Sequence, residues 1–159
     1  PIVLDADGLY PFSNNIEILC QRDSPLIITP HLTELARLIG CKKEMILSDF
    51  SNVMTGFRKN YKQVCMVKQV PACILYENSI RINTTGNPGL ASAGTGDVLT
   101  GIIASLVSQG LNCYDSASVG AYIHGQTSDK LVDRKGYRGQ LSSDLIKFLP
   151  SIISSYEKS

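Results

Sequence analysis

The chain has 159 residues, of which 43% are hydrophobic and 18% are charged, and this globular composition is sufficient to bury one core. Its formal net charge of +1 gives no basic field for nucleic acid, and no apolar run approaches the roughly 20 residues of a membrane span. We therefore expect one domain, or part of one, that binds neither nucleic acid nor a membrane.

The cysteine pattern indicates a reducing compartment. The five cysteines are odd in number and form no Cys-x-x-Cys pair, which argues against a disulfide framework and against a zinc site. We expect all of them to be reduced core residues: Cys20, Cys41, Cys65, Cys73 and Cys113. The sequence shows no signal peptide, and we expect a cytoplasmic location.

The first predicted strand covers residues 2–4 and is followed by Asp5 and Asp7. This pattern is typical of a parallel strand that delivers polar residues to its carboxyl edge, where open α/β sheets bind ligands. The simpler alternative is that both aspartates form a turn before Gly8.

A second buried strand is predicted for residues 26–29, and Pro30 ends it. A helix should follow over residues 33–39, with Thr33 as its N-cap and Gly40 at its end. His31 then lies in the strand-to-helix loop, again at the ligand edge, although a loop histidine is often only solvated. Residues 43–61 have the spacing of one amphipathic helix.

The middle of the chain reads as a third strand over residues 63–68 and a hairpin of residues 72–77 and 79–83 joined at Asn78. Towards the C-terminus we expect helices over residues 116–132 and 142–156, the second restarting at Pro150. His124 should be a packed core residue of the first. Strands alternating with helices predict an α/β fold with a mostly parallel sheet and a local hairpin.

The glycine-rich run from Gly86 to Asp97 leads into an apolar segment with helical spacing, so a helix should begin near Thr95 or Asp97. A glycine turn at a helix N-terminus suits a phosphate or a developing oxyanion. The motif is not a P-loop, because no Gly-Lys-Ser/Thr closes it. It is not a dinucleotide loop, because Leu99 stands where that loop needs its last glycine. In the simpler interpretation Asp97 is an N-cap or an acid of the first helical turn, and the glycines only form a tight turn.

Several motifs in order resemble the ADP/ATP-dependent NAD(P)H-hydrate dehydratases of the ribokinase-like superfamily. They are Asp5-Ala6-Asp7-Gly8-Leu9, Thr29-Pro30-His31 with Glu34, Gly86-Asn87-Pro88-Gly89, Gly94-Thr95-Gly96-Asp97-Val98-Leu99 and Ser143-Asp144-Leu145-Ile146. The resemblance implies a ribokinase-like fold, of which residues 1–159 would be the C-terminal part. We therefore expect that an N-terminal part is absent, cleaved or carried by another chain.

The resemblance also implies repair of NADHX and NADPHX by phosphorylation of the ring hydroxyl and loss of phosphate, at the expense of ADP or ATP. Asp97 would be the catalytic base and would also contact the substrate. The N–H groups from Gly94 through Thr95 to Gly96 would hold the transferring phosphoryl group. The hydrated nicotinamide would face His31, Glu34, Asp7 and Asn87.

The nucleotide would be held by Gly96 and by the turn Lys68-Gln69-Val70-Pro71-Ala72, in which Gln69 replaces the glycine of the family's Lys-Gly turn. Mg²⁺ should arrive with the nucleotide, because no dedicated carboxylate cluster is visible in the sequence. The Asn-Pro-Gly-Leu form resembles the bacterial, ADP-using branch. The sequence leaves open whether the protein forms a homo-oligomer.

Two alternatives remain open at this stage. A ribokinase-like kinase for a small alcohol would use the same aspartate without elimination, and a nucleotide-binding module would lack catalysis. The Gly-Asn-Pro-Gly and Thr-Pro-His motifs favour the dehydratase, whereas the departure at Gln69 keeps the module as an alternative.

Overall fold

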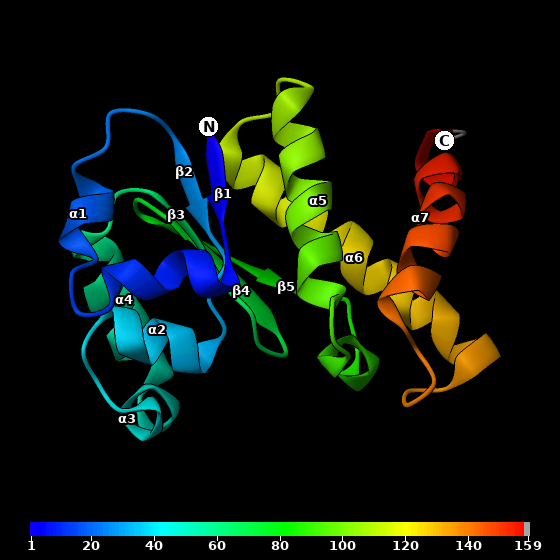
Figure 1. Ribbon diagram of the computed structural model, residues 1–159, viewed down its shortest axis with the longest axis horizontal. Helices are drawn as coiled ribbons and strands as arrows, with labels where there is room; N and C mark the ends of the chain where they lie inside the picture. The colour runs from blue at the N-terminus through cyan, green and yellow to red at the C-terminus, as the bar shows by residue number, and fades with distance from the viewer. Residues whose placement is uncertain (158–159) are drawn as a thin grey trace.

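The computed structural model describes residues 1–157 and contains one mixed sheet of five strands in the order β1-β2-β3-β4-β5 (Figure 1). Strands β1 (Ile2–Leu4), β2 (Leu26–Ile28) and β3 (Val64–Val67) are parallel. Strands β4 (Ala72–Tyr76) and β5 (Ser79–Asn83) continue the sheet as an antiparallel hairpin beside β3. The sheet therefore has the predicted parallel part and the predicted hairpin.

Helices cover both faces of this sheet (Figure 1). One face is covered by the segments between the parallel strands, which are the 3-10 helix η1 (Ala6–Phe12), α1 (Glu17–Cys20), α2 (Leu32–Leu38), α3 (Lys43–Ser48) and α4 (Phe50–Asn60). The other face is covered by the later helices. These are α5 (Thr95–Ser108) and α6 (Cys113–Lys135), on which α7 (Ser142–Glu157) packs; the short 3-10 helix η2 (Pro88–Ala91) precedes α5.

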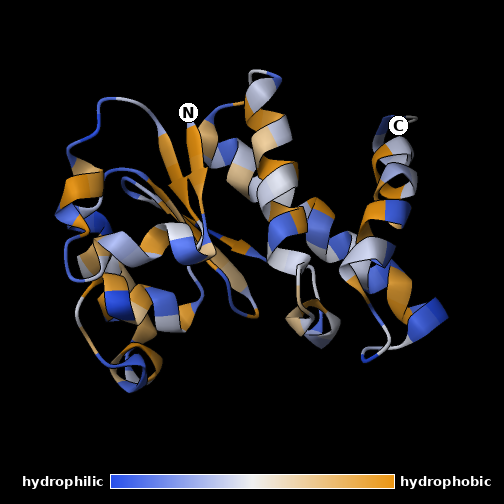
Figure 2. Ribbon diagram, in the orientation of Figure 1, coloured by the Kyte–Doolittle hydropathy of each residue, from blue (hydrophilic) through white to orange (hydrophobic). Residues whose placement is uncertain are grey.

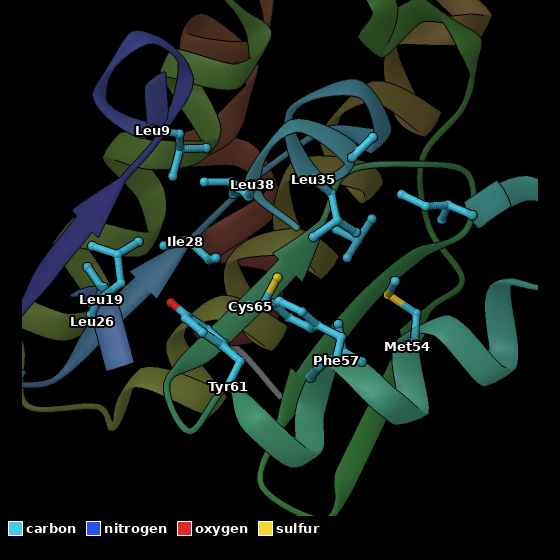
Figure 3. Close-up of a cluster of buried hydrophobic side chains, with 14 residues drawn as sticks. Leu9, Leu19, Leu26, Ile28, Leu35, Leu38, Met54, Phe57, Tyr61 and Cys65 are labelled. Atoms are coloured by element: carbon cyan, nitrogen blue, oxygen red, sulfur yellow. The ribbon is translucent and has the colours of Figure 1, made fainter. Parts of the chain in front are cut away.

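Two hydrophobic cores result, one on each face, because successive side chains of a strand point to opposite sides of the sheet. Ile28 and Cys65 belong to the core beneath α2 and α4, whereas Ile27 and Val64 belong to the core beneath α5 and α6. Figure 3 shows the first of these cores, and Figure 2 shows the apolar character of β1 and β2. Strands β2 and β3 are buried along their whole length, as central parallel strands should be.

The expected helix over residues 43–61 is wrong, because the structure divides it into α3 and α4. The break lies at Asp49, whose backbone leaves the helical region at φ −148° and ψ 58°. Its carboxylate accepts a hydrogen bond from the Asn52 side chain at 2.9 Å and a longer one from the Asn52 N–H at 3.4 Å. A short polar side chain that bonds to nearby backbone competes with the helix, so Asp49 caps a new helix instead of continuing the old one.

Other boundaries also differ from the expectation. Residues after Asp5 form η1 rather than a simple turn, and α6 extends beyond the predicted residues 116–132 at both ends. Helix α7 does not restart at Pro150, which lies inside it. The five cysteines are free, as expected, but only Cys65 and Cys73 are buried; the expectation that all five are core residues is wrong for the partly exposed Cys20, Cys41 and Cys113. Within residues 1–157, no helix combines the length and apolar character needed to cross a lipid bilayer.

Candidate functional site

The candidate site lies where the carboxyl ends of β2 and β3 approach the beginning of α5. The two strand ends are joined by a hydrogen bond from the Lys68 N–H to the Pro30 carbonyl at 2.8 Å, and His31 lies opposite Lys68 in this parallel pairing. A cavity of about 500 Å³ opens beside them. Eight of the residues predicted to bind ligands line it: His31, Lys68, Gln69, Val70, Ala72, Asn87, Thr95 and Gly96.

The beginning of α5 has the geometry that the glycine motif predicts. Gly94 precedes the helix with φ 81°, a left-handed conformation that favours glycine, and an added Cβ would lie 3.0 Å from the Ser142 hydroxyl. The Thr95 hydroxyl donates to carbonyl groups of the preceding turn, 2.6 Å from that of Leu90. Among residues 1–157, the N–H groups of Gly96 and Asp97 have no hydrogen-bond acceptor. Helix α5 therefore presents free donors and the positive end of its dipole.

An ion pair lies directly against this helix start. Lys68 Nζ is 2.5 Å from Asp5 Oδ1, and the Thr100 hydroxyl donates to Asp5 Oδ2 at 3.2 Å. A Cβ added to Gly96 would lie 3.4 Å from Asp5 Oδ2 and 3.6 Å from Lys68 Nζ. The acid, the cation and the first turn of α5 thus form one cluster, although they come from distant parts of the chain.

The loop from Gly86 to Gly89 is fixed by an acid on α6. Asp129 accepts hydrogen bonds from the Gly86 N–H and from the Asn87 side-chain amide, both at 2.9 Å. The side-chain oxygen of Asn87, Oδ1, accepts from the Gly89 N–H at 2.9 Å. A Cβ on Gly125 would lie 2.8 Å from the Gly86 nitrogen, so the loop and α6 are in direct contact. Both polar ends of Asn87 are therefore engaged in holding the loop.

His31 and Glu34 form a reciprocal cap at the start of α2. Nδ1 of His31 accepts from the Thr33 and Glu34 N–H groups at 3.1 and 3.2 Å, and Glu34 Oε2 accepts from the His31 N–H at 2.8 Å. The predicted N-cap at Thr33 is therefore wrong, because the histidine side chain takes that role two residues earlier. His31 remains half exposed and lines the cavity, whereas Glu34 does not.

Asp97 lies on the other side of the first turn of α5. It is exposed, and its carboxylate has no hydrogen-bond or ion-pair partner among residues 1–157. It lines a second cavity, of about 580 Å³, between α5 and α7, together with Gly94. The cap at the helix start is Gly94, so Asp97 is not the N-cap; it is an acid of the first turn, which is the other form of the simpler interpretation.

Of the remaining predicted residues, some line the first cavity and others do not. The Gln69 side chain contacts the Cys73 sulfur at 3.7 Å, and a cis peptide bond joins Val70 to Pro71. Pro71 does not line either cavity, and Asp7 is exposed on η1. The structure therefore brings Asp5, not Asp7, to the beginning of α5.

His124 is buried, as expected, and it also lines the first cavity. Burial, helped by the positive charge of Lys68, lowers the pKa of its imidazole to about 4. A hydrogen bond with the Thr95 backbone acts in the opposite direction but does not outweigh the burial. Its Nε2 has no hydrogen-bond partner within the described residues. The imidazole is therefore neutral at physiological pH.

Sequence reasoning placed Asp5 with Asp7 at the ligand edge but named only Asp7 as a substrate contact, and it did not single out Thr100 or Asp129. Asp5 and Asp7 show the same pattern in the sequence, a carboxylate that follows a strand. Only the path of the chain after the strand decides which of the two side chains reaches the site. Asp129 and Thr100 lie within helices at positions that resemble ordinary polar surface, so no local pattern could have identified them.

Comparisons with known proteins agree with this architecture. The family model for NAD(P)H-hydrate dehydratase matches residues 1–151. A bifunctional NAD(P)H-hydrate repair enzyme of Moorella thermoacetica is 38% identical over 159 residues, which are 99% of this chain and 30% of that protein. An ADP-dependent (S)-NAD(P)H-hydrate dehydratase of Neisseria meningitidis is 35% identical over 139 residues, which are 86% of this chain and 47% of that protein.

A solved structure supports the fold. The ADP/ATP-dependent NAD(P)H-hydrate dehydratase of Bacillus subtilis, co-crystallised with ATP and Mg²⁺, superposes with a TM-score of 0.83 at 24% identity, over 98% of this chain and 55% of that one. The predicted ribokinase-like α/β fold is confirmed. The chain therefore spans a third to about half of the relatives that it matches, and it belongs to the NAD(P)H-hydrate dehydratase family.

Proposed function

We propose that this chain supplies the nucleotide site and the catalytic base of an enzyme that converts NADHX and NADPHX back to NADH and NADPH with ADP or ATP. The observation that carries this proposal is the beginning of α5, where Gly96, whose N–H is free, and the Lys68 ammonium line one cavity, and the free N–H of Asp97 follows in the same turn. Such a helix start binds phosphate through its backbone donors and its dipole. Membership of the dehydratase family supports the choice of reaction.

The nucleotide would lie in the first cavity. Its phosphates would accept hydrogen bonds from the N–H groups of Gly96 and Asp97, and Lys68 would contribute a charge-assisted bond. The turn from Gln69 to Ala72 would contact the rest of the nucleotide, because three of its residues line the same cavity. Each backbone donor aimed at the transferring phosphoryl group would contribute about 2.7 to 4 kcal/mol to catalysis in a site that excludes water.

Asp97 would accept the proton of the ring hydroxyl as that oxygen attacks the terminal phosphorus of the nucleotide. Its carboxylate is unpaired and sits one residue from Gly96, so it could reach an alcohol approaching the phosphate from the side of the second cavity. Loss of phosphate from one ring carbon and of a proton from the neighbouring carbon would then restore the double bond. His31, with Glu34, Asp7 and Asn87 as further candidates, would contact the hydrated nicotinamide.

We propose that Mg²⁺ is bound mainly through the nucleotide. Within residues 1–157, no group of three or more His, Cys, Asp or Glu side chains converges as a metal site. A Mg²⁺ ion commonly uses one or two carboxylates together with substrate phosphates, so the residues present fit this arrangement. When bound, the ion would neutralise part of the phosphate charge.

We further propose that residues 1–159 form the C-terminal part of a single ribokinase-like domain. The relatives are longer than this chain, and the second cavity beside Asp97 is lined largely by apolar residues of α5 and α7. The remainder of such a domain would cover this cavity and complete the substrate site. Full activity would then require the full-length protein.

The test replaces Asp97 by Asn in the full-length protein and follows NADH formation from NADHX with ADP or ATP. Asparagine keeps the size of the side chain but removes the base, so kcat should fall by at least about 100-fold. Affinity for the nucleotide should hold or rise, because a negative charge leaves the phosphate site. An unchanged kcat would remove Asp97 from the mechanism.

The wild-type reaction separates the proposal from a small-alcohol kinase and from a binding module. A dehydratase consumes NADHX and releases NADH and phosphate, whereas a kinase would phosphorylate a small alcohol without forming NADH. A module would bind the nucleotide and turn over nothing. NADH formation that depends on added nucleotide is the expected result.

A further inference from the structure

We propose that Asp5 is a positioning residue that holds the Lys68 ammonium at the beginning of α5, where it would bind the terminal phosphate of the nucleotide. The inference rests on the proposed nucleotide site and adds Asp5 and Thr100 to it. Lys68 comes from the end of β3 and Asp5 from the end of β1, with β2 between them in the sheet. Their ion pair therefore crosses the carboxyl edge of all the parallel strands.

The two residues of this ion pair lie at different positions relative to the cavity. Lys68 lines the cavity, whereas Asp5 does not, so the carboxylate lies behind the ammonium as seen from the ligand. The Asp5 side chain is 10% exposed and that of Lys68 is 22% exposed. An ammonium in this position can still donate to a phosphate, because a lysine has three N–H bonds and only one is needed for Asp5.

Thr100 fixes the carboxylate in turn. Its hydroxyl donates to Asp5 Oδ2 from the second turn of α5, while Oδ1 of the same carboxylate accepts from Lys68. Thr100 lies four residues after Gly96 and so on the same face of the helix. The contacts from Thr100 through Asp5 to Lys68 thus fix the position of the ammonium relative to the helix that supplies the free N–H groups.

Anchoring matters because a lysine side chain is long and flexible. A free Lys68 would lose much of its rotamer freedom on binding a phosphate, and this loss would weaken the complex. In the structure the ammonium is already within reach of the position that a Cβ of Gly96 would occupy, at 3.6 Å. Asp5 therefore acts through preorganisation, and its own negative charge works against phosphate binding.

These opposing effects define the experiment, which measures the affinities of ADP and AMP by calorimetry in the full-length protein. AMP lacks the terminal phosphate and serves as an internal reference. We expect Lys68→Met and Asp5→Ala each to weaken ADP binding by about 10-fold or more, and AMP binding by less than about 3-fold. Adding Asp5→Ala to Lys68→Met should cause no further loss of ADP affinity, because Asp5 acts through Lys68 and its remaining effect is repulsion of the phosphate.

Thr100→Val provides a second variant that leaves every charge in place. It should weaken ADP binding in the same direction as Asp5→Ala but by less, and it keeps the proposal testable if Asp5→Ala fails to fold. The control is Asp115→Ala, which breaks the Arg81–Asp115 ion pair in the first turn of α6. It should leave the affinities of both ADP and AMP unchanged.

Three results would overturn the inference. ADP binding that becomes tighter in Asp5→Ala would mean that Asp5 acts only by repulsion. Equal losses for AMP and ADP, or effects of Asp5→Ala and Lys68→Met that simply add, would indicate a general structural role. If the wild-type protein binds neither nucleotide, the proposed function itself fails, and the inference fails with it.

Discussion

Replacing Gly96 by Ala should separate the stability of the fold from the affinity of the site. The position lies in the first turn of α5 and its φ is not in the left-handed region. An added Cβ would meet Asp5 Oδ2 at 3.4 Å and Lys68 Nζ at 3.6 Å, both ordinary contact distances. Because alanine favours a helix over glycine by up to about 1 kcal/mol, the free energy of unfolding should stay the same or rise.

The same methyl group should weaken nucleotide binding, because it would stand between the free N–H groups and the Lys68 ammonium on the cavity side. A hydrogen bond to a charged group contributes about 1.5 to 3 kcal/mol. Losing one such bond to a phosphate would reduce affinity by about 10- to 100-fold. Stability and affinity should thus change in opposite directions.

Calorimetric titration with ADP and urea denaturation of the full-length protein measure the two quantities. The matched control is Gly56→Ala in the interior of α4, where an added Cβ meets no atom within 4 Å. That variant should gain stability by about 0.5 to 1 kcal/mol and bind ADP like the wild type. If Gly96→Ala also binds ADP like the wild type, the phosphates do not lie at the beginning of α5.

Three further predictions concern the support of the site. The pKa of His124 falls to about 4 in the folded state, so the unfolded chain binds the proton more readily. The free energy of unfolding should therefore decrease by up to about 3 kcal/mol as the pH falls from about 6.5 to 4. Urea denaturation of His124→Gln over the same pH range should lack this decrease. Gly125→Ala would place a Cβ 2.8 Å from the Gly86 nitrogen, so it should destabilise the protein by about 1 to 3 kcal/mol in thermal or urea denaturation, and an unchanged midpoint would contradict the close contact of α6 with the loop. Asp49→Ala should cost about 0.5 to 2 kcal/mol through loss of the α4 cap without altering ADP affinity; a stability like that of the wild type would show that the cap contributes nothing.

The sequence by itself determined the features that depend on near neighbours in the chain. Gly94 must adopt φ 81°, and only a glycine does so readily, so the motif alone predicted the turn before α5. The apolar run of β2 predicted a buried strand, residues 63–68 were predicted as a third strand, and Asn78 predicted the hairpin turn. These elements form for local reasons, and the prediction of the α/β fold followed from their order.

Local patterns failed where two neighbouring residues offered the same chemistry. Thr33 and His31 can both cap a helix, and the structure uses His31 because Glu34 can reach back to its N–H. Asp49 looks like an ordinary polar residue of an amphipathic helix, yet its side chain bonds locally and ends α3. Such choices depend on small differences in local geometry that residue spacing does not record.

Only the tertiary structure decided how the site is assembled. Asp5 and Lys68 are 63 residues apart, and Thr100 is 95 residues from Asp5, so their contact exists only because β1 and β3 end where α5 begins. Asp129 reaches the Gly86 loop from α6 across 43 residues. Hydrogen bonds and ion pairs act over about 3 Å whatever the separation along the chain, and a sequence pattern carries no information about which distant side chains come within that range.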